Sequence, residues 1–208
     1  MTGDDPNART IESYEDIVDE YAAETEGAGV LAHCLERLAE TVPGGQVLEI
    51  GSGPGWDADR LETAGLTVQR TDVTQAFLAF QRDRGKDVDE LNVLSDDLGG
   101  PYDGVVALHV LQHVEDDHLP GVLAKVAAAL RPDGRFLVSI PLGEEVGWQT
   151  GESGKPYFRA LRTEAAFRDQ LERAGLAVDW SDRAHQDAEE GWFCALTRRD
   201  PEIVSHNS

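Results

Sequence analysis

The fold of this chain follows from one stretch, Val47-Leu48-Glu49-Ile50-Gly51-Ser52-Gly53-Pro54-Gly55. Its first half is a short apolar run that predicts a buried strand, and its second half is a glycine-rich loop that opens a helical segment at residues 56–64. Glycines at such a turn permit positive φ angles and let a ligand approach the backbone without meeting a Cβ. A strand, a glycine loop and a helix in this order therefore predict a ligand site rather than a plain turn.

Strand and helix patterns alternate along the rest of the chain. The predicted strands are residues 47–50, 66–71, 91–94, 104–110, 136–140, 176–180 and 192–197, and helices are predicted at 56–64, at 74–85 behind Thr74, at 119–130 and at 163–175 behind Thr163. Residues 131–134 read as a turn. This alternation predicts an α/β doubly wound sheet, which binds ligands at the carboxyl ends of its strands. The last two strands have no helix between them, which predicts an antiparallel hairpin.

The 208 residues read as a single domain. We expect a disordered lead-in at residues 1–10 and two N-terminal helices within residues 11–42, where apolar side chains recur at helical spacing. Residues 143–162 follow the fifth strand and read as an insertion on the substrate side of the sheet.

Acidic residues outnumber basic ones 40 to 18, which gives a formal net charge of −22. Such a field repels phosphate backbones and anionic membranes, so neither nucleic acid nor membrane is expected as a partner. No stretch approaches the roughly 18 apolar residues of a membrane span, and the N-terminus lacks the features of a signal peptide, so we expect a cytoplasmic protein.

Cys34 and Cys194 lack the spacing of a zinc site and read as buried hydrophobes, and no metal site is expected.

The residues around the glycine loop restrict its ligand. Dinucleotide binding asks for a third glycine where this chain has Trp56, and no Gly-Lys-Ser/Thr follows as in a phosphate-binding loop. The predicted ligand is therefore a nucleoside without phosphates. Asp72, at the end of the second strand, is expected to accept hydrogen bonds from both ribose hydroxyls, with a solvent-exposed role as the alternative. Asn92 and Val93 are expected at the adenine, with Asp96 and Asp97 as rivals for the polar contact.

These segments, together with residues 102–114 (YDGVVALHVLQHV) and 130–136 (LRPDGRF), resemble the class I S-adenosylmethionine-dependent methyltransferases. The resemblance is to the small-molecule branch, which includes the ubiquinone and menaquinone C-methyltransferase-like proteins, and it covers residues 11–198. It implies a seven-stranded, mostly parallel sheet with an antiparallel last strand and N-terminal lid helices. It also implies S-adenosyl-L-methionine as cofactor and S-adenosyl-L-homocysteine as product.

The resemblance also implies roles for individual residues. It places Gly51, Ser52, Gly53 and Gly55 at the methionine portion and ribose, Asp72 with Val73 at the ribose hydroxyls, Asn92 with Val93 at the adenine, and Leu108 with His109 near the amino group and sulfur. The family usually has Asp where this chain has Asn92, whose amide oxygen can still accept a hydrogen bond from the adenine amine.

Methyl transfer from a sulfonium is an in-line displacement, so much of its catalysis comes from alignment, and a base is needed only if the acceptor must lose a proton. The nearest titratable groups are His109 and His113, just beyond the fourth strand. We expect His113 to act as a catalytic base or substrate contact, with a structural hydrogen bond as the alternative. Tyr14 and Tyr21 lie seven residues apart on one helix face, which suits a cofactor contact and core packing equally.

The insertion carries aromatic residues and two arginines in an otherwise acidic chain: Trp148, Tyr157, Phe158, Arg159 and Arg162. This combination suggests an acceptor site for a planar or anionic small molecule, with loop anchoring as the alternative. We expect Trp148, Tyr157, Arg159 and Arg162 to bind the substrate.

The sequence therefore predicts a small-molecule methyltransferase whose acceptor atom is carbon, nitrogen or oxygen. The family's amino-methylating motif of Asn or Asp, two prolines and an aromatic residue does not follow the fourth strand, where the chain reads Ala107-Leu108-His109-Val110. This absence and the acidic charge argue against DNA adenine and protein-glutamine substrates. The alternatives are a non-catalytic module that binds the nucleoside cofactor and a nicotinamide-dependent oxidoreductase, the latter opposed by Trp56.

Overall fold

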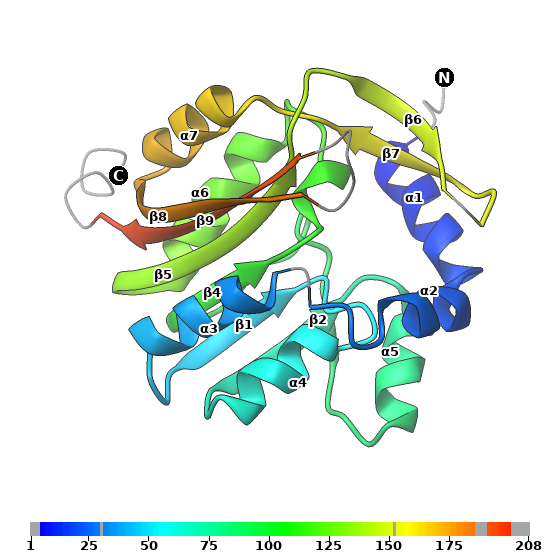
Figure 1. The fold of residues 1–208 in the computed structure, drawn as a ribbon, viewed down its shortest axis with the longest axis horizontal. Helices are drawn as coiled ribbons and strands as arrows, with labels where there is room; N and C mark the ends of the chain where they lie inside the picture. Colours follow the sequence, from blue (N-terminus) through cyan, green and yellow to red (C-terminus); the bar gives the residue numbers. More distant parts are fainter. Residues whose placement is uncertain (1–4, 30, 152, 186–190, 201–208) are drawn as a thin grey trace.

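The structure is a computed structural model that describes residues 5–29, 31–151, 153–185 and 191–200. Its elements, in chain order, are α1 (Pro6–Glu15), α2 (Val18–Thr25), α3 (Ala32–Thr41), β1 (Gln46–Ile50), α4 (Trp56–Thr63), β2 (Thr67–Asp72), α5 (Gln75–Asp83), β3 (Asp89–Glu90), β4 (Tyr102–Ala107), the 3₁₀ helix η1 (Leu111–His113), α6 (Leu119–Ala129), β5 (Leu130–Pro141), β6 (Val146–Thr150), β7 (Pro156–Ala160), α7 (Glu164–Arg173), β8 (Leu176–His185) and β9 (Gly191–Arg199) (Figure 1).

Within the described residues, seven strands form one sheet in the order β3-β2-β1-β4-β5-β9-β8. The pairs from β3 to β5 are parallel, and β9 is antiparallel to both β5 and β8, which confirms the predicted fold class. The chain order reverses between β1 and β4, and the crevice at such a reversal is where open α/β sheets bind ligands.

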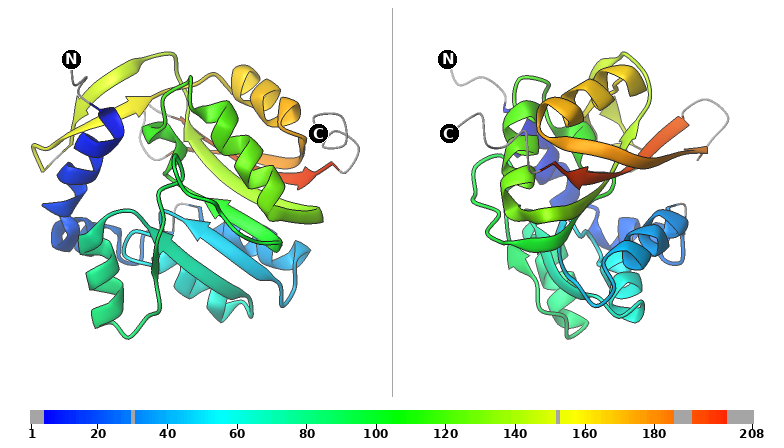
Figure 2. Two further views of the ribbon diagram at one scale, coloured as in Figure 1. Left: turned by 180° about the vertical axis from the view of Figure 1, so that it is seen from behind. Right: turned by 90° about the vertical axis from the view of Figure 1, so that its left-hand side faces the viewer.

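Helices cover both faces of the sheet (Figure 2). Successive residues of a strand point to opposite sides, so a strand of consecutive apolar residues needs a cover on each face. Val47 belongs to an apolar cluster with Leu35 and Leu38 of α3 and with Leu61 of α4. Its neighbour Leu48 belongs to a second cluster that includes residues of α6 and α7. Burial on two faces thus explains the short apolar run that predicted this strand.

Several predicted strand boundaries are wrong. Residues 131–134 were expected as a turn but belong to β5, where the pairing with β4 shifts register between Tyr102 and Gly104, and β8 extends to His185 rather than ending at residue 180. The third strand was expected at residues 91–94, whereas β3 is Asp89–Glu90, and the chain turns just beyond it. Asn92 causes this turn, because its carbonyl group accepts from the backbone N–H of Ser95 and of Asp96 and its side-chain oxygen accepts from the N–H of Leu94. The fourth strand was expected to reach residue 110 but β4 ends at Ala107, since His109 takes a left-handed φ of 57°.

At the N-terminus the structure has three helices rather than two, and α1 includes residues 6–10. The expectation of disorder is therefore wrong for these residues, while residues 1–4 lie outside the described part. Asp5 caps the helix by accepting from the N–H of Asn7 at 3.0 Å, and Pro6 supplies a helical φ at the first position. The polar composition of this segment concealed a capped helix start.

The insertion contains a two-stranded antiparallel hairpin, β6 and β7, which the sequence did not predict as strands. This hairpin lies beside α1 (Figure 1), where Thr10 Oγ1 accepts from the N–H of Phe158 at 3.0 Å and Ser13 Oγ donates to the carbonyl of Pro156 at 2.6 Å. Two segments that are far apart in the sequence thus form one cover over the carboxyl edge of the sheet. We call α1 and α2 the lid and β6 with β7 the hairpin.

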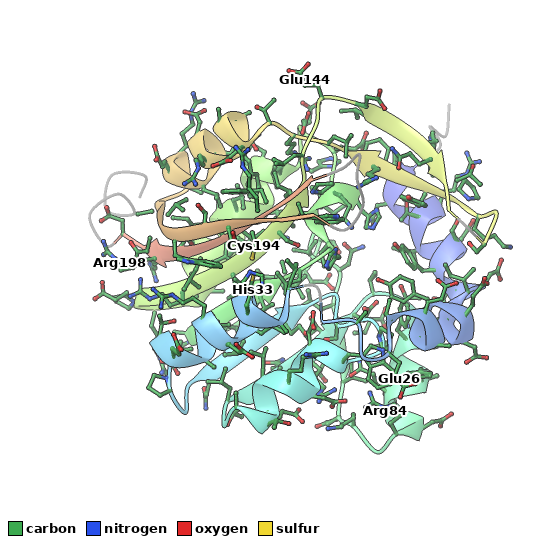
Figure 3. The ribbon with its side chains drawn as sticks, viewed as in Figure 1. Glu26, His33, Arg84, Glu144, Cys194 and Arg198 are labelled. Carbon is green, nitrogen blue, oxygen red and sulfur yellow. The ribbon has the colours of Figure 1, made fainter. Side chains whose placement is uncertain are left out.

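The helices and the cysteines of the chain were also subjects of prediction. No helix in the described residues combines the length and apolar character needed to cross a membrane. Cys34 on α3 and Cys194 on β9 are both buried free thiols in the same apolar cluster, as predicted for small hydrophobes (Figure 3 labels Cys194 and the neighbouring His33).

Candidate functional site

A cavity of about 750 Å³, measured with its open mouth, lies at the carboxyl ends of β1, β2 and β4 beneath the lid. The residues predicted for a site that line it are Tyr14, Tyr21, Gly51, Gly53, Asp72, Val73, Asn92, Val93, His109 and His113. Ser52 and Leu108 line an adjoining cavity that shares Gly51, Gly53, Tyr21 and His109 with the first. The two together are called the cofactor cavity below.

The glycine loop has the backbone that the sequence predicts, with φ angles of 67° at Gly51 and 53° at Gly53. A Cβ on Gly51 would lie 2.6 Å from Val110 Cγ2, so this position excludes any side chain. The carbonyl of Gly53 accepts from Gln81 Nε2 at 2.8 Å. Arg84, labelled in Figure 3, donates to the carbonyl of Pro54 at 2.7 Å, so two side chains of the α5 region hold the loop from below.

Gly55 does not line the cofactor cavity among the described residues, which corrects the expected cofactor contact. A Cβ on Gly55 would instead lie 2.6 Å from both Arg70 Nη1 and Gln81 Oε1. The buried guanidinium of Arg70 donates to the carbonyl of Gly55 and forms ion pairs with Asp59 at 2.6 Å and Glu62 at 2.8 Å. Gly55 is therefore needed for the packing beneath the loop, a reason that no local sequence signal reveals.

Asp72 is only 5% exposed, which excludes the solvent-exposed alternative. Its Oδ2 accepts from the N–H of Gly53 at 2.8 Å and its Oδ1 from the N–H of Thr74 at 2.8 Å. Burial raises the pKa of Asp72, and the backbone hydrogen bonds act in the opposite direction. Asp72 lines the cavity wall, where its carboxylate can accept hydrogen bonds from ligand hydroxyls.

Asn92 lines the cavity, but both ends of its amide are engaged within the protein. Its Nδ2 donates to Asn7 Oδ1 at 3.2 Å, and its Oδ1 accepts from the N–H of Leu94 at 2.9 Å. Its Nδ2 keeps a second hydrogen and its Oδ1 a second lone pair, so the expected polar contact from Asn92 to adenine stays a prediction, and Val93 offers the flat apolar contact. Asp96 accepts from the N–H of Asn92 at 2.8 Å and is absent from the described lining.

Two carboxyl groups that the sequence did not single out, Glu49 and Asp57, flank the glycine loop in the chain, and of these two only Asp57 lines the cofactor cavity. Glu49, on β1, is fully enclosed, and burial together with the charge of Asp57 raises the pKa of Glu49 to about 8. Its Oε2 has no hydrogen-bond partner among the described residues. Asp57 lines the cavity beside Ser52, and burial raises its pKa as well. A charged residue inside an otherwise apolar strand was the available signal for Glu49.

His113 makes hydrogen bonds through both ring nitrogens. Its Nδ1 is 2.7 Å from the carbonyl of Phe158, which can only accept, so Nδ1 carries the proton and Nε2 offers its lone pair to Tyr14 Oη and Gln112 Nε2, each at 3.2 Å. Burial lowers the pKa of His113 to about 4. The expected catalytic base is therefore corrected to a positioning residue, since its lone pair is engaged by groups that tie the lid to the hairpin.

Tyr14 and Tyr21 pack as one of their two expected roles requires, and their contact with the cofactor stays a prediction. Their rings meet edge to face with centroids 5.7 Å apart, and each also packs on Phe77 of α5. Both line the cofactor cavity. His109 faces the same space, and its imidazole packs 4.3 Å from the ring of Trp192, with its pKa lowered to about 4 by burial and by the charges of His113 and Arg159. Trp192 was not singled out in the sequence, since nothing local links β9 to β4.

The hairpin separates the residues expected to bind substrate, because alternate residues of a strand point to opposite faces. Tyr157 and Arg159 share one face: both contact Gln149 Oε1, at 3.4 and 3.1 Å. Trp148 lies on the other face, 39% exposed and packed on Phe158 and Arg9, outside the described cavities. The expected substrate contact of Trp148 is therefore corrected.

Arg162 is also corrected, to the loop-anchoring role that was its alternative. Its side chain is buried, and it donates to Asp116 Oδ1 at 2.9 Å, to the carbonyl of Leu111 at 2.9 Å and to that of Val114 at 2.6 Å. These bonds fasten the end of the hairpin segment to the turn that follows β4. With its donors committed to the protein, Arg162 is not placed to bind substrate.

The family of sequences described as "Methyltransferase domain" matches residues 21–180 of this chain. The chain belongs to the S-adenosylmethionine-dependent methyltransferases. A "Probable S-adenosylmethionine-dependent methyltransferase" of Mycolicibacterium smegmatis is 30% identical over 149 residues, which cover 69% of this chain and 56% of that protein. The chain spans about half the length of that relative and 4% of the length of the hybrid synthetases that it also matches.

Two solved structures share the fold of this methyltransferase. The DhpI complex with S-adenosylhomocysteine has a TM-score of 0.77 at 24% identity and covers 96% of this chain and 100% of its own. The Burkholderia thailandensis 1,6-didemethyltoxoflavin-N1-methyltransferase, solved with bound 1,6-didemethyltoxoflavin and S-adenosylhomocysteine, has a TM-score of 0.71 at 22% identity and covers 93% of this chain and 87% of its own.

The residues present fit the methyl donor of the family. Gly51 and Gly53 line the cavity without a side chain, Asp72 lies at its wall as a carboxyl group for hydroxyls, and Asp57 supplies a second carboxyl group that suits an ammonium group. In the part of the chain that the structure describes, no group of three or more His, Cys, Asp and Glu side chains is placed to hold a metal ion.

Proposed function

We propose that the protein transfers the methyl group of S-adenosylmethionine to a small-molecule acceptor that enters between the lid and the hairpin. The observation that carries this proposal is the convergence of the glycine loop, the buried Asp72 and Asp57 on one cavity that the lid covers. An enzyme needs a cavity for the acceptor beside the cofactor, whereas a module that only binds the nucleoside does not.

Each part of the cavity has a role in holding the donor. Asp72 accepts from the two ribose hydroxyls, Val93 contacts the flat face of the adenine, and Asp57 receives the ammonium group of the methionine portion. Leu108 and His109 lie beside the sulfur. When bound, S-adenosylmethionine supplies a methyl group on a positively charged sulfur, which departs as a neutral thioether.

The remaining task of the protein is alignment and exclusion of water. The rings of Tyr14 and Tyr21 close the cavity from the lid side, and the hydrogen bond from Tyr14 to His113 holds that closure in register with the hairpin. In an in-line displacement at a methyl group, alignment of the acceptor with that methyl group lowers much of the activation free energy. The acidic composition of this chain, and the small molecule bound in the structure of the toxoflavin enzyme, support an acceptor of low molecular weight.

Isothermal titration with S-adenosylhomocysteine and, separately, with NAD tests the cofactor. We expect binding of the first and none of the second, because Trp56 occupies the place of the third glycine and its indole packs against Arg84. A screen of metabolites for uptake of labelled methyl then tests the reaction. Binding of S-adenosylhomocysteine with no methyl transfer to any acceptor would favour the non-catalytic module, and tight NAD binding alone would overturn the proposal.

A further inference from the structure

A second cavity, of about 680 Å³ measured with its mouth, lies between the lid and the hairpin. We call it the outer cavity. Tyr14 and Tyr21 of the lid line both the outer cavity and the cofactor cavity, so they lie between the two spaces. Tyr157 of β7 lines the outer cavity from the hairpin side, and the imidazole of His113 meets the rings of Tyr157 and Tyr14 edge to face, with centroids 5.9 and 5.6 Å apart. Three tyrosines therefore border a space next to the proposed site of the methyl donor.

The charged side chains that line the outer cavity leave an excess of negative charge. Glu20 and Glu24 lie one turn apart on α2, and neither side chain has a hydrogen-bond or ion-pair partner among the residues that the structure describes. Burial raises the pKa of Tyr21 to about 12, and the negative charge of Glu24 acts in the same direction, so this carboxylate lies near the phenol. Lys155, in the turn between β6 and β7, also lines the cavity, but its ammonium group forms an ion pair with Asp16 at 2.5 Å. Two carboxylates of the described lining thus remain uncompensated.

The two arginines of the insertion, which suggested an anionic ligand in the sequence, are absent from the described lining of the outer cavity. Arg159 donates to Gln149 Oε1 at 3.1 Å and lies 5.8 Å from the ring of Trp192. Arg162 is held by Asp116 and by backbone carbonyls. Phenol rings attract cations to their faces, and carboxylates attract cations and repel anions. The lining therefore favours a positively charged ligand, and the net charge of −22 acts in the same direction.

Resting on the proposed function, we propose that the acceptor is a small molecule with a protonated amine, which binds in the outer cavity with this cation at Glu20 and Glu24 and its body among the three tyrosines. Because both glutamates are exposed, the cation lies towards the mouth and away from the positive sulfur of the donor. An ammonium group has no lone pair, so a different atom of the acceptor is methylated. The new bond forms from a lone pair of that atom, the carbon–sulfur bond breaks with its electron pair left on sulfur, and any proton on the attacking atom leaves to water.

Three phenols of similar size test this charge preference: tyramine as cation, 4-hydroxyphenylacetamide as neutral compound and 4-hydroxyphenylacetate as anion. Titration calorimetry on protein saturated with S-adenosylhomocysteine gives their dissociation constants. We expect tyramine to bind about tenfold more tightly than the amide, as two partly screened ion pairs together contribute, and the anion to bind more weakly than either. Added salt should reduce the preference for the cation, because salt screens exposed charges. Glu20→Gln combined with Glu24→Gln should reduce this preference to about threefold or less, which the rings and the net charge still supply, and each single substitution should give part of the loss.

Asp19→Asn combined with Glu26→Gln is the matched control, because it removes the same number of charges from the α2 region at exposed positions outside the described lining of the outer cavity (Figure 3 labels Glu26). It should leave the preference for tyramine unchanged. Unchanged affinity for S-adenosylhomocysteine in all variants shows that the fold is retained.

Four results would each overturn the inference: a ligand other than tyramine binding most tightly, a cation preference that survives loss of both Glu20 and Glu24, an equal loss of preference in the control, or no binding of any of the three phenols at millimolar concentration. In all four the protein still binds S-adenosylhomocysteine, so the proposed function stands. Failure of the wild-type protein to bind S-adenosylhomocysteine would overturn the proposed function, and the inference with it.

Discussion

Replacing Asp72 by Asn tests the centre of the cofactor site with almost no change in side-chain volume. In the native protein the carboxylate accepts from the N–H of Gly53 and of Thr74, each at 2.8 Å, and the ribose hydroxyls are proposed to bind it from the cavity. The amide of Asn has one oxygen, so it cannot accept on both sides. The charge that strengthens the hydroxyl contacts is lost as well.

The size of the effect follows from these contacts. Loss of charge-assisted hydrogen bonds to the ribose should weaken cofactor binding by about 1 to 3 kcal/mol, which raises the dissociation constant about 5- to 150-fold. Because either Gly53 or Thr74 also loses its buried acceptor, the free energy of unfolding should fall by about 1 to 3 kcal/mol. The two effects are separable, since one is measured with ligand and the other without.

Titration calorimetry with S-adenosylhomocysteine gives the dissociation constant, and urea denaturation of the ligand-free protein gives the stability. Asp96→Asn is the matched control, because Asp96 also accepts a backbone N–H at 2.8 Å but does not line the described cavity. A folded Asp72→Asn variant that binds as tightly as the Asp96→Asn variant would refute the ribose role.

Three further substitutions test the surroundings of the site. Burial raises the pKa of Glu49 to about 8, so the folded protein keeps a proton that the unfolded chain releases. The free energy of unfolding should therefore fall as pH rises from the ordinary pKa of a glutamate to about 8, at up to about 1.4 kcal/mol per pH unit. Glu49→Gln should remove this pH dependence, which urea denaturation across the range measures. Gly55→Ala should lower the melting temperature more than Gly44→Ala, because both positions have positive φ but only at Gly55 does a Cβ clash with buried side chains; equal losses would contradict the packing role. Glu15 of the lid accepts from the N–H groups of Gln75 and Ala76 at the start of α5. Glu15→Gln should weaken this contact and speed the release of S-adenosylhomocysteine in stopped-flow measurements. An unchanged release rate would show that this contact does not hold the lid.

Prediction from the sequence was accurate where local order carries the information. The apolar run before Gly51 predicted β1, and Thr163 predicted the start of α7, whose cap is confirmed by the hydrogen bond from the N–H of Ala166. Thr74 does lie at the start of α5 but makes no side-chain cap, because Glu15 of α1 takes that place from a distance of some sixty residues along the chain. Periodicity locates an element, and contacts between distant segments determine what completes it.

The substrate side shows the same division. Tyr157, Arg159, Arg162 and Trp148 looked alike in sequence, as aromatic and cationic residues in one insertion. Strand pairing in the hairpin sorted them, because alternation sends Trp148 to the outer face, and burial committed Arg162 to backbone carbonyls. No hairpin was predicted, so no face could be assigned.

The sequence by itself determined the class of fold and the place of the ligand. The glycines after β1 and Asp72 at the end of β2 act through local geometry that any sheet of this class reproduces. Only the tertiary structure decided which side chains reach the cavity. The pairing of Glu49 with Asp57, the support of Gly55 by Arg70 and the occupied lone pair of His113 all depend on burial and on partners distant in sequence. Those partners become neighbours only when the sheet, the lid and the hairpin pack together, and the free energy of each contact depends on how far that packing excludes water.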